Sequence, residues 1–137
     1  MVDAETALDF TCPPKVLYLY CNFKSINKYK FIVMVYKDAK EILFFLINSK
    51  SYWFSQTSEI KITHCECSFL DHDSYVDCNE LFILPKKCFI EMISKNINDF
   101  DKGYLDKSIA QKMVEVIQKS ETISQKNKTK IIGVLTD

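Results

Sequence analysis

The chain has 137 residues, and its 47% of hydrophobic and 13% of aromatic residues exclude global disorder and fit one domain with one core. Eighteen basic residues balance eighteen acidic ones, so no net charge attracts the protein to nucleic acid or to a membrane. Every basic residue is a lysine, which counts against any mechanism that needs the planar guanidinium of arginine.

The cysteines are predicted to be reduced thiols in a cytoplasmic protein. The first residues, MVDAET, carry acid and lack the basic-then-apolar layout of a signal peptide. A chain of this length and hydrophobicity also needs no disulfide to fold. No apolar run reaches the ~20 residues that cross a bilayer, so no membrane partner is expected.

The first half of the chain has the pattern of β-strands. Residues 1–14 are weakly patterned and end in Pro13-Pro14, so they are expected to form a loose leader. Apolar runs rich in β-branched and aromatic residues follow, separated by polar turns at 24–28 and 37–40. These runs predict strands over 15–23 (KVLYLYCNF), 29–36 (YKFIVMVY) and 41–47 (EILFFLI). Residues 60–67 alternate in polarity and predict one more strand, with His64 inside it.

The second half has helical spacing. Pro85 suits the start of a helix, and apolar residues repeat at helical intervals until about Asn96. A loop is expected over 99–105. Asp106 and Ser124 are positioned to cap two further helices, the second of which is expected to end at Gly133.

Strands followed by helices indicate an α+β domain spanning residues 1–137. The expected architecture is a small, curled, antiparallel β-barrel of the SH3-like type over residues 15–84. Two or three helices in residues 85–137 are expected to cover it.

The segment 69–78 (FLDHDSYVDC) has the densest set of reactive groups in the chain. It holds three carboxylates, one of the two histidines, a hydroxyl and a thiol. His72 or Asp73 is a candidate base. His72 is preferred because an imidazole is suited to proton transfer at neutral pH, with Asp71 or Asp73 to orient it. The alternative is structural, with both carboxylates accepting hydrogen bonds from a turn.

The order of elements and the runs quoted above resemble the MazF/PemK (Kid) toxin superfamily. The resemblance extends from Lys15 to Ser120 and rests on the three apolar strands, the segment HCECSFLDHDSYVDC and the helices that follow. It implies an SH3-like barrel that forms homodimers, cuts single-stranded RNA without a cofactor and is silenced by an antitoxin protein.

Within this resemblance, the run LINS ends at the family's hydroxyl position, which assigns that role to Ser49, and Asp73 falls where the family can carry an acid. The chain departs from the family at two places. Pro14-Lys15 stands where a Gly-Asp pair is usual, and Tyr29-Lys30 where an Arg-Pro pair is usual. The family's catalytic arginine is therefore absent.

The candidate catalytic set joins the end of the third strand to the segment 69–78 at one rim of the barrel. It consists of His72, Asp73, Ser49 and Lys50, in which Lys50 would supply the missing cation. The candidate RNA-binding set supplies amide, hydroxyl and aromatic groups for unpaired bases. It consists of Asn48, Tyr52, Trp53 and Ser74.

Two alternatives stay open. His64, Cys65 and Cys67 offer zinc ligands, with His72 and Cys78 nearby, but their spacing is not that of a structural zinc site and no metal is predicted. The chain is either a toxin-type endoribonuclease of a toxin–antitoxin or defence module, or an inactive barrel that binds protein or nucleic acid.

Overall fold

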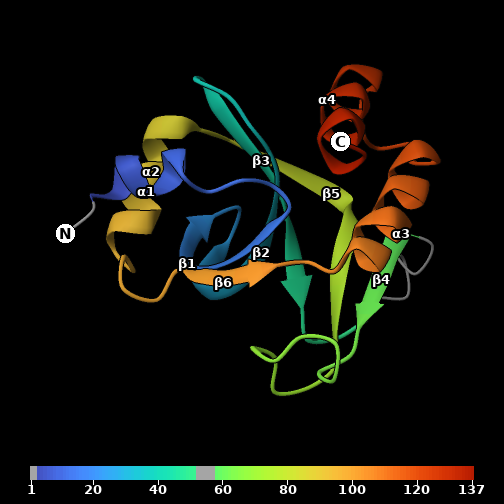
Figure 1. The fold of residues 1–137 in the computed structure, drawn as a ribbon, viewed down its shortest axis with the longest axis horizontal. Helices are drawn as coiled ribbons and strands as arrows, with labels where there is room; N and C mark the ends of the chain where they lie inside the picture. Colours follow the sequence, from blue (N-terminus) through green and yellow to red (C-terminus); the bar gives the residue numbers. More distant parts are fainter. Residues whose placement is uncertain (1–2, 52–57) are drawn as a thin grey trace.

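The computed structural model describes residues 3–51 and 58–137, which form an α+β structure with one six-stranded antiparallel sheet and four helices (Figure 1). The strand order is β4-β5-β3-β2-β1-β6. The elements are α1 (Ala4–Asp9), β1 (Lys15–Phe23), β2 (Ile26–Lys37), β3 (Glu41–Asn48), β4 (Glu59–Ile62), β5 (Ser74–Pro85), α2 (Lys86–Ser94), β6 (Asp101–Tyr104), α3 (Lys107–Gln118) and α4 (Gln125–Leu135).

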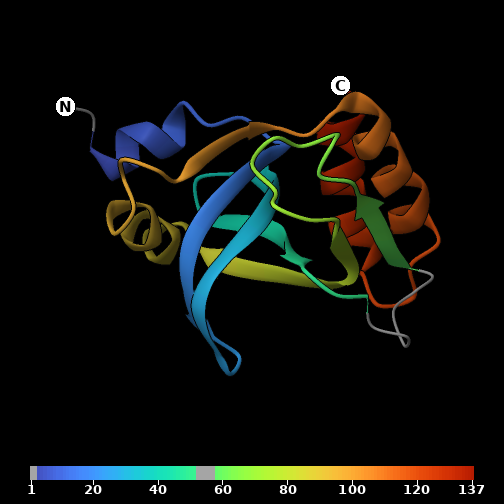
Figure 2. The same cartoon turned by 90° about the horizontal axis from the view of Figure 1, so that it is seen from below.

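The three long predicted strands are confirmed, with a tighter first turn than expected. Lys24 and Ser25 have φ values of 47° and 68°, so two residues in the left-handed region close the hairpin. Residues 26–28, predicted as turn, therefore begin β2 and pair with β1. The hairpin projects beyond the rest of the sheet (Figure 2).

The sheet is covered on both faces, which explains why β3 is apolar at almost every position. Its even-numbered residues, such as Phe44, belong to a core with α1 and α2, and its odd-numbered residues, such as Phe45, to a core with α3 and α4. The two helix pairs lie at opposite ends of the view in Figure 1. The alternation of a strand thus divides its side chains between two separate cores.

The sheet curls without closing, since β4 and β6 are its two edges. Register shifts in the β2–β3 and β3–β5 pairings bend the strands. The hairpin tip reaches β5 through side chains, because Lys24 Nζ donates to Glu80 Oε2 at 3.0 Å and the Phe23 ring lies 5.3 Å from that of Phe82. The α+β class is confirmed, while a closed barrel is not seen in the described part of the chain.

Two segments expected to be irregular are ordered, so both predictions were wrong. Residues 4–9 of the expected leader form α1, in which Asp3 Oδ1 accepts from the backbone N–H of Thr6 at 2.8 Å and Leu8 is fully buried. Within the expected loop 99–105, residues Asp101–Tyr104 form β6 against β1. In both cases, contacts with residues far away in the sequence stabilise a segment whose own sequence pattern is weak.

The strand predicted over 60–67 is also wrong beyond Ile62. Thr63 begins a turn, in which its carbonyl accepts from the backbone N–H of Glu66 at 3.0 Å. The Glu66 carboxylate accepts in return from the backbone N–H and the hydroxyl of Thr63. These local bonds replace the strand pairing, so His64 lies in a turn and Cys65 and Cys67 do not share a strand face.

All three C-terminal helices are found. Pro85 precedes α2 as its N-cap, and Ser124 caps α4 by accepting from the backbone N–H of Asn127 at 3.2 Å. Helix α4 continues through Gly133, the predicted end, to Leu135. Within the described residues, every helix is too short or too polar to cross a membrane.

Candidate functional site

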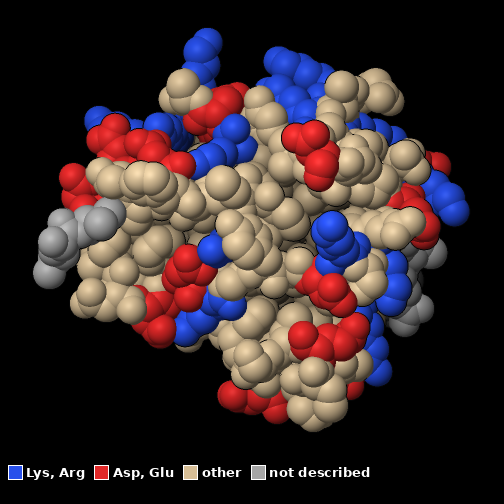
Figure 3. All heavy atoms as spheres, viewed as in Figure 1, with Lys and Arg blue, Asp and Glu red and all other residues tan. Residues whose placement is uncertain are grey.

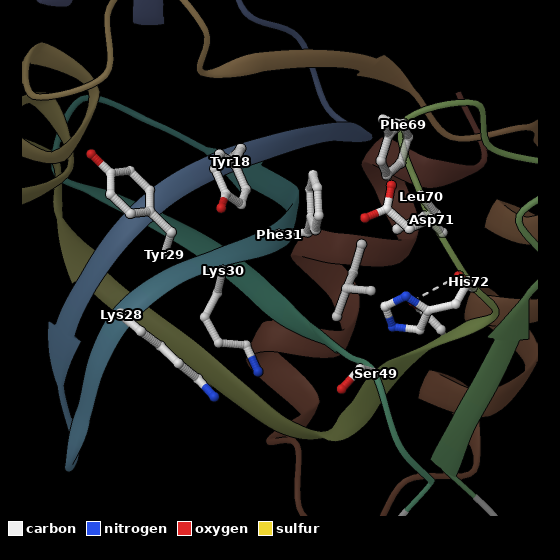
Figure 4. Close-up of a pocket in the computed structure, with 12 residues that line it drawn as sticks. Tyr18, Lys28, Tyr29, Lys30, Phe31, Ser49, Phe69, Leu70, Asp71 and His72 are labelled. Atoms are coloured by element: carbon white, nitrogen blue, oxygen red, sulfur yellow. Dashed lines mark hydrogen bonds between the residues drawn. The ribbon is translucent and has the colours of Figure 1, made fainter.

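A cleft of about 410 Å³ opens where the first half of β2 runs past the end of β3 (Figure 4). Pairing between β2 and β3 begins only at Phe31 and Ile47. The segment 63–73 folds back over this opening, with Leu70 buried and Phe69 packed against Phe31. The cleft thus brings Ser49, at the end of the third strand, together with His72 and Ser74 of the segment 69–78.

An aromatic row runs from the hairpin into the cleft. Its rings come from facing positions on β1 and β2 and end on the segment 69–78, in the order Tyr20, Tyr29, Tyr18, Phe31 and Phe69. Successive ring centroids are 5.3, 5.2, 4.6 and 5.3 Å apart. Tyr29 is 43% exposed, so part of this row is open to a ligand.

Lys30 brings a cation into the same cleft. Its side chain is partly buried, and Nζ donates to Oδ1 of Asn48 at 2.6 Å. Burial lowers the pKa of Lys30, the neighbouring charge of Lys28 lowers it further, and Cys21 and Asp77 oppose the shift. The amine is therefore fixed in position and loses its proton more readily than an exposed lysine.

A carboxylate with the opposite perturbation lies near Lys30. Burial raises the pKa of Asp77, and the charges of Glu59 and Glu80 add to this effect. A backbone hydrogen bond from Asn79, at 3.0 Å, and the charge of Lys30 oppose it. Paired groups whose pKa values shift toward neutrality are typical of functional sites, though structural networks produce them too.

The polar groups of the cleft's other wall come from the ends of β3 and β5. Ser49, Asp71 and His72 are exposed and line the cleft, and Ser74 donates from Oγ to the carbonyl of His72 at 3.3 Å. Figure 4 shows the Lys30 amine ending on the side of the cleft where Ser49 and His72 lie. The cleft therefore combines an imidazole, an amine and hydroxyls.

Asp73, one of the two carboxylates expected to orient His72, is bonded to His64. Asp73 Oδ1 lies 3.0 Å from Nδ1 of His64 and accepts from the His64 backbone N–H at 3.2 Å, while Lys61 Nζ is 3.6 Å from Oδ2. The hydrogen bonds from His64 lower the pKa of Asp73. Asp73 therefore stabilises the turn at His64. This agrees with the structural alternative, in which the carboxylate accepts hydrogen bonds from a turn.

The other predicted residues divide between the cleft and its surroundings. Ser49, His72 and Ser74 line the cleft. Asn48 is buried and contributes by holding Lys30, whereas Lys50 is exposed and is not among the lining residues. The predicted base-stacking residues Tyr52 and Trp53 lie outside the described residues.

Sequence reasoning missed the residues contributed by the hairpin. Lys28, Lys30 and the aromatic residues were read only as parts of strands, and the cation was assigned to Lys50. One signal was present, because the run NKYKF at 27–31 alternates lysine with aromatic residues after Asn27. Such alternation in an otherwise apolar strand indicates that this half of the strand extends beyond the core and is accessible to solvent.

The thiols differ in exposure, which gives a first test of the structure. Exposed thiols are those of Cys12, Cys65 and Cys88, and buried thiols those of Cys21, Cys67 and Cys78. Burial raises the pKa of Cys21 to about 11 and also raises that of Cys78. We expect a thiol reagent at neutral pH to label the exposed three in the native protein and all six after unfolding, as counted by mass spectrometry.

The same experiment tests the predicted absence of disulfides and zinc. Fewer than six labelled thiols after unfolding without reductant would reveal a disulfide, and metal analysis of the purified protein would detect zinc. Among residues 3–51 and 58–137, no three His, Cys, Asp or Glu side chains gather in a way that could hold a metal ion.

Comparison with known proteins leaves the cleft as the main guide to function. No protein-family model matches the chain, and no curated protein matches it.

Proposed function

We propose that the cleft binds single-stranded RNA. The observation that carries this proposal is the aromatic row, four of whose five rings line an accessible cleft together with Lys28 and Lys30. Unpaired bases stack on aromatic side chains, and lysines bind the phosphates between them. A double helix keeps its bases inside, so this arrangement favours a single strand.

The charge distribution favours RNA binding by contacts within the cleft over attraction of RNA by the charge of the whole protein. The protein has no net charge, and acidic and basic side chains are interspersed on the face shown in Figure 3. Few phosphates would therefore be neutralised, and the affinity should depend only weakly on salt. Stacking on the aromatic row would supply most of the binding free energy.

Within this proposal, the chain acts as a toxin-type protein of a toxin–antitoxin or defence module. The support is the resemblance to the MazF/PemK superfamily in the sequence runs and their order, together with a curled antiparallel sheet in an α+β fold. A homodimer, an antitoxin partner and a cytoplasmic location belong to the same proposal.

Cleavage of the bound strand is the second candidate function. Cleavage through the 2′-hydroxyl needs a base and a cation near the phosphate, and it needs no metal. His72 and Lys30 line the same cleft, so Lys30 takes the role that the sequence assigned to Lys50. The alternative is an inactive module that binds RNA and leaves it intact.

Binding is tested with a fluorescently labelled single-stranded RNA and variants of exposed tyrosines. We expect Tyr29→Ala to weaken binding by about 1–3 kcal/mol, or about 5- to 150-fold in Kd, because one stacking platform is lost. Anisotropy titration measures the change. Tyr29 is 43% exposed, so its truncation should leave the fold intact.

Tyr104→Ala is the matched control, since Tyr104 is 58% exposed and lies on β6, away from the cleft lining. Its Kd should equal that of the wild type. Equal losses in the two variants, or a wild type that binds no single-stranded RNA, would overturn the proposal.

A further inference from the structure

Lys30 has the features of a nucleophilic amine. Asn48 is 8% exposed and holds the amine through the 2.6 Å hydrogen bond, so Nζ has a defined position on the cleft wall. An ammonium group has no free electron pair, whereas a neutral amine attacks carbonyl carbon. The burial that lowers the pKa of Lys30 increases the neutral fraction at a given pH.

The surroundings of Lys30 indicate which carbonyl compound would reach it. Four rings of the aromatic row line the same cleft as this amine and offer surfaces for bases, while Lys28 also lines the cleft and can bind a phosphate. A strand that has lost one base keeps its neighbouring bases and phosphates. At the gap, its sugar opens to an aldehyde at C1′, and the missing base leaves room for the amine.

We propose that Lys30 forms an imine with the ring-opened sugar of an abasic nucleotide and cleaves the strand at that position. This activity rests on the proposed function only in requiring that the cleft hold a single strand. It differs from cleavage through a 2′-hydroxyl, because it acts on a damaged sugar and passes through a covalent bond to the protein.

The steps need no oxidant, reductant or metal. The Nζ electron pair attacks C1′, and loss of water from the resulting carbinolamine gives the protonated imine. Removal of a proton from C2′ then breaks the C3′–O bond, so the 3′-phosphate leaves as the 5′ end of the downstream fragment. His72, which lines the same cleft, is positioned to accept the C2′ proton. Water hydrolyses the imine of the unsaturated aldehyde and frees Lys30.

The test uses the full-length protein and a single-stranded DNA oligonucleotide with one abasic site, because stacking and phosphate contacts do not require the 2′-hydroxyl. Sodium borohydride reduces the imine to a stable amine, which links the protein to the DNA on a denaturing gel. We expect an adduct with the wild type, peptide mass spectrometry that places it on Lys30, and strand cleavage when borohydride is omitted.

Two lysine variants make the test specific. The adduct should be lost in Lys30→Met and retained in Lys50→Met, whose side chain is exposed and is not among the lining residues. Asn48→Ala keeps the amine but removes the group that holds it, so the adduct should form more slowly. The mapping of the wild-type adduct does not depend on any variant folding correctly.

Each result separates this activity from RNA binding. A wild type that binds undamaged single strands but yields no adduct overturns the imine proposal and leaves the proposed function standing. An adduct mapped to another lysine, or one of equal yield in Lys30→Met, also overturns it. A wild type that neither binds undamaged strands nor forms an adduct overturns both proposals.

Discussion

Phe44→Ala is expected to lower the free energy of unfolding by about 3–5 kcal/mol, because it leaves a large cavity in a close-packed core. The Phe44 side chain is fully buried. Its ring centroid lies 5.8 Å from that of Phe23, 5.5 Å from Phe82 and 5.7 Å from Phe89. The residue therefore joins the hairpin, β5 and α2, and its loss affects three elements at once.

Urea denaturation measures this change as a shift in the midpoint concentration of urea. The dependence of the unfolding free energy on urea concentration should be the same in wild type and variant, which shows that both expose the same surface on unfolding. Ile83→Ala is the control, since Ile83 is an apolar residue of β5 that is 45% exposed and its truncation should cost much less. Because small proteins have only about 5–15 kcal/mol of stability, Phe44→Ala should be strongly destabilised. Equal midpoint shifts in the two variants would show that Phe44 does not join these elements.

The strands were predictable because their signals are local. The runs 15–23, 29–36 and 41–47 are apolar, β-branched and aromatic, and their alternation suits a sheet buried on both faces. The two short turns between them follow from polar residues. Pro85 marked the boundary between β5 and α2 for the same reason, since its effect on the backbone is a property of one residue.

The missed elements depend on partners elsewhere in the chain. Strand β6 exists because β1 offers it an edge, and α1 is anchored by Leu8 in the core shared with α2. The turn at Thr63 depends on the Glu66 side chain, which accepts hydrogen bonds from the backbone N–H and the hydroxyl of Thr63. These bonds take the place of strand pairing. Periodicity alone contains no information about these bonds.

The candidate site shows the same division. The sequence located one wall, with Ser49, His72 and Ser74, from the density of polar groups near a strand end. It could not show that β2 extends past β3, so that Lys30 and most of the aromatic row line the cleft. It named Asp71 or Asp73 as the carboxylate that orients His72, but it could not show that a turn brings Nδ1 of His64 to 3.0 Å from Oδ1 of Asp73.

His72→Ala is expected to abolish any RNA cleavage while leaving the thermal midpoint nearly unchanged. His72 is exposed, and substitutions at exposed positions usually change stability by no more than about 0.5 kcal/mol. Its imidazole lines the cleft together with Lys30, so it is the group placed to move a proton beside a phosphate bound by that amine. Gel electrophoresis of end-labelled single-stranded RNA measures cleavage, and circular dichroism measures the midpoint.

His64→Ala is the matched control, because His64 is also exposed but lies outside the cleft lining and bonds to Asp73. It should retain cleavage even though the turn loses a hydrogen bond. Cleavage that persists in His72→Ala would remove the imidazole from the mechanism. A wild type that binds RNA without cutting it would instead support the binding module. Unfolding of His72→Ala would mean that the segment 69–78 is structural, because an exposed catalytic imidazole contributes little to stability.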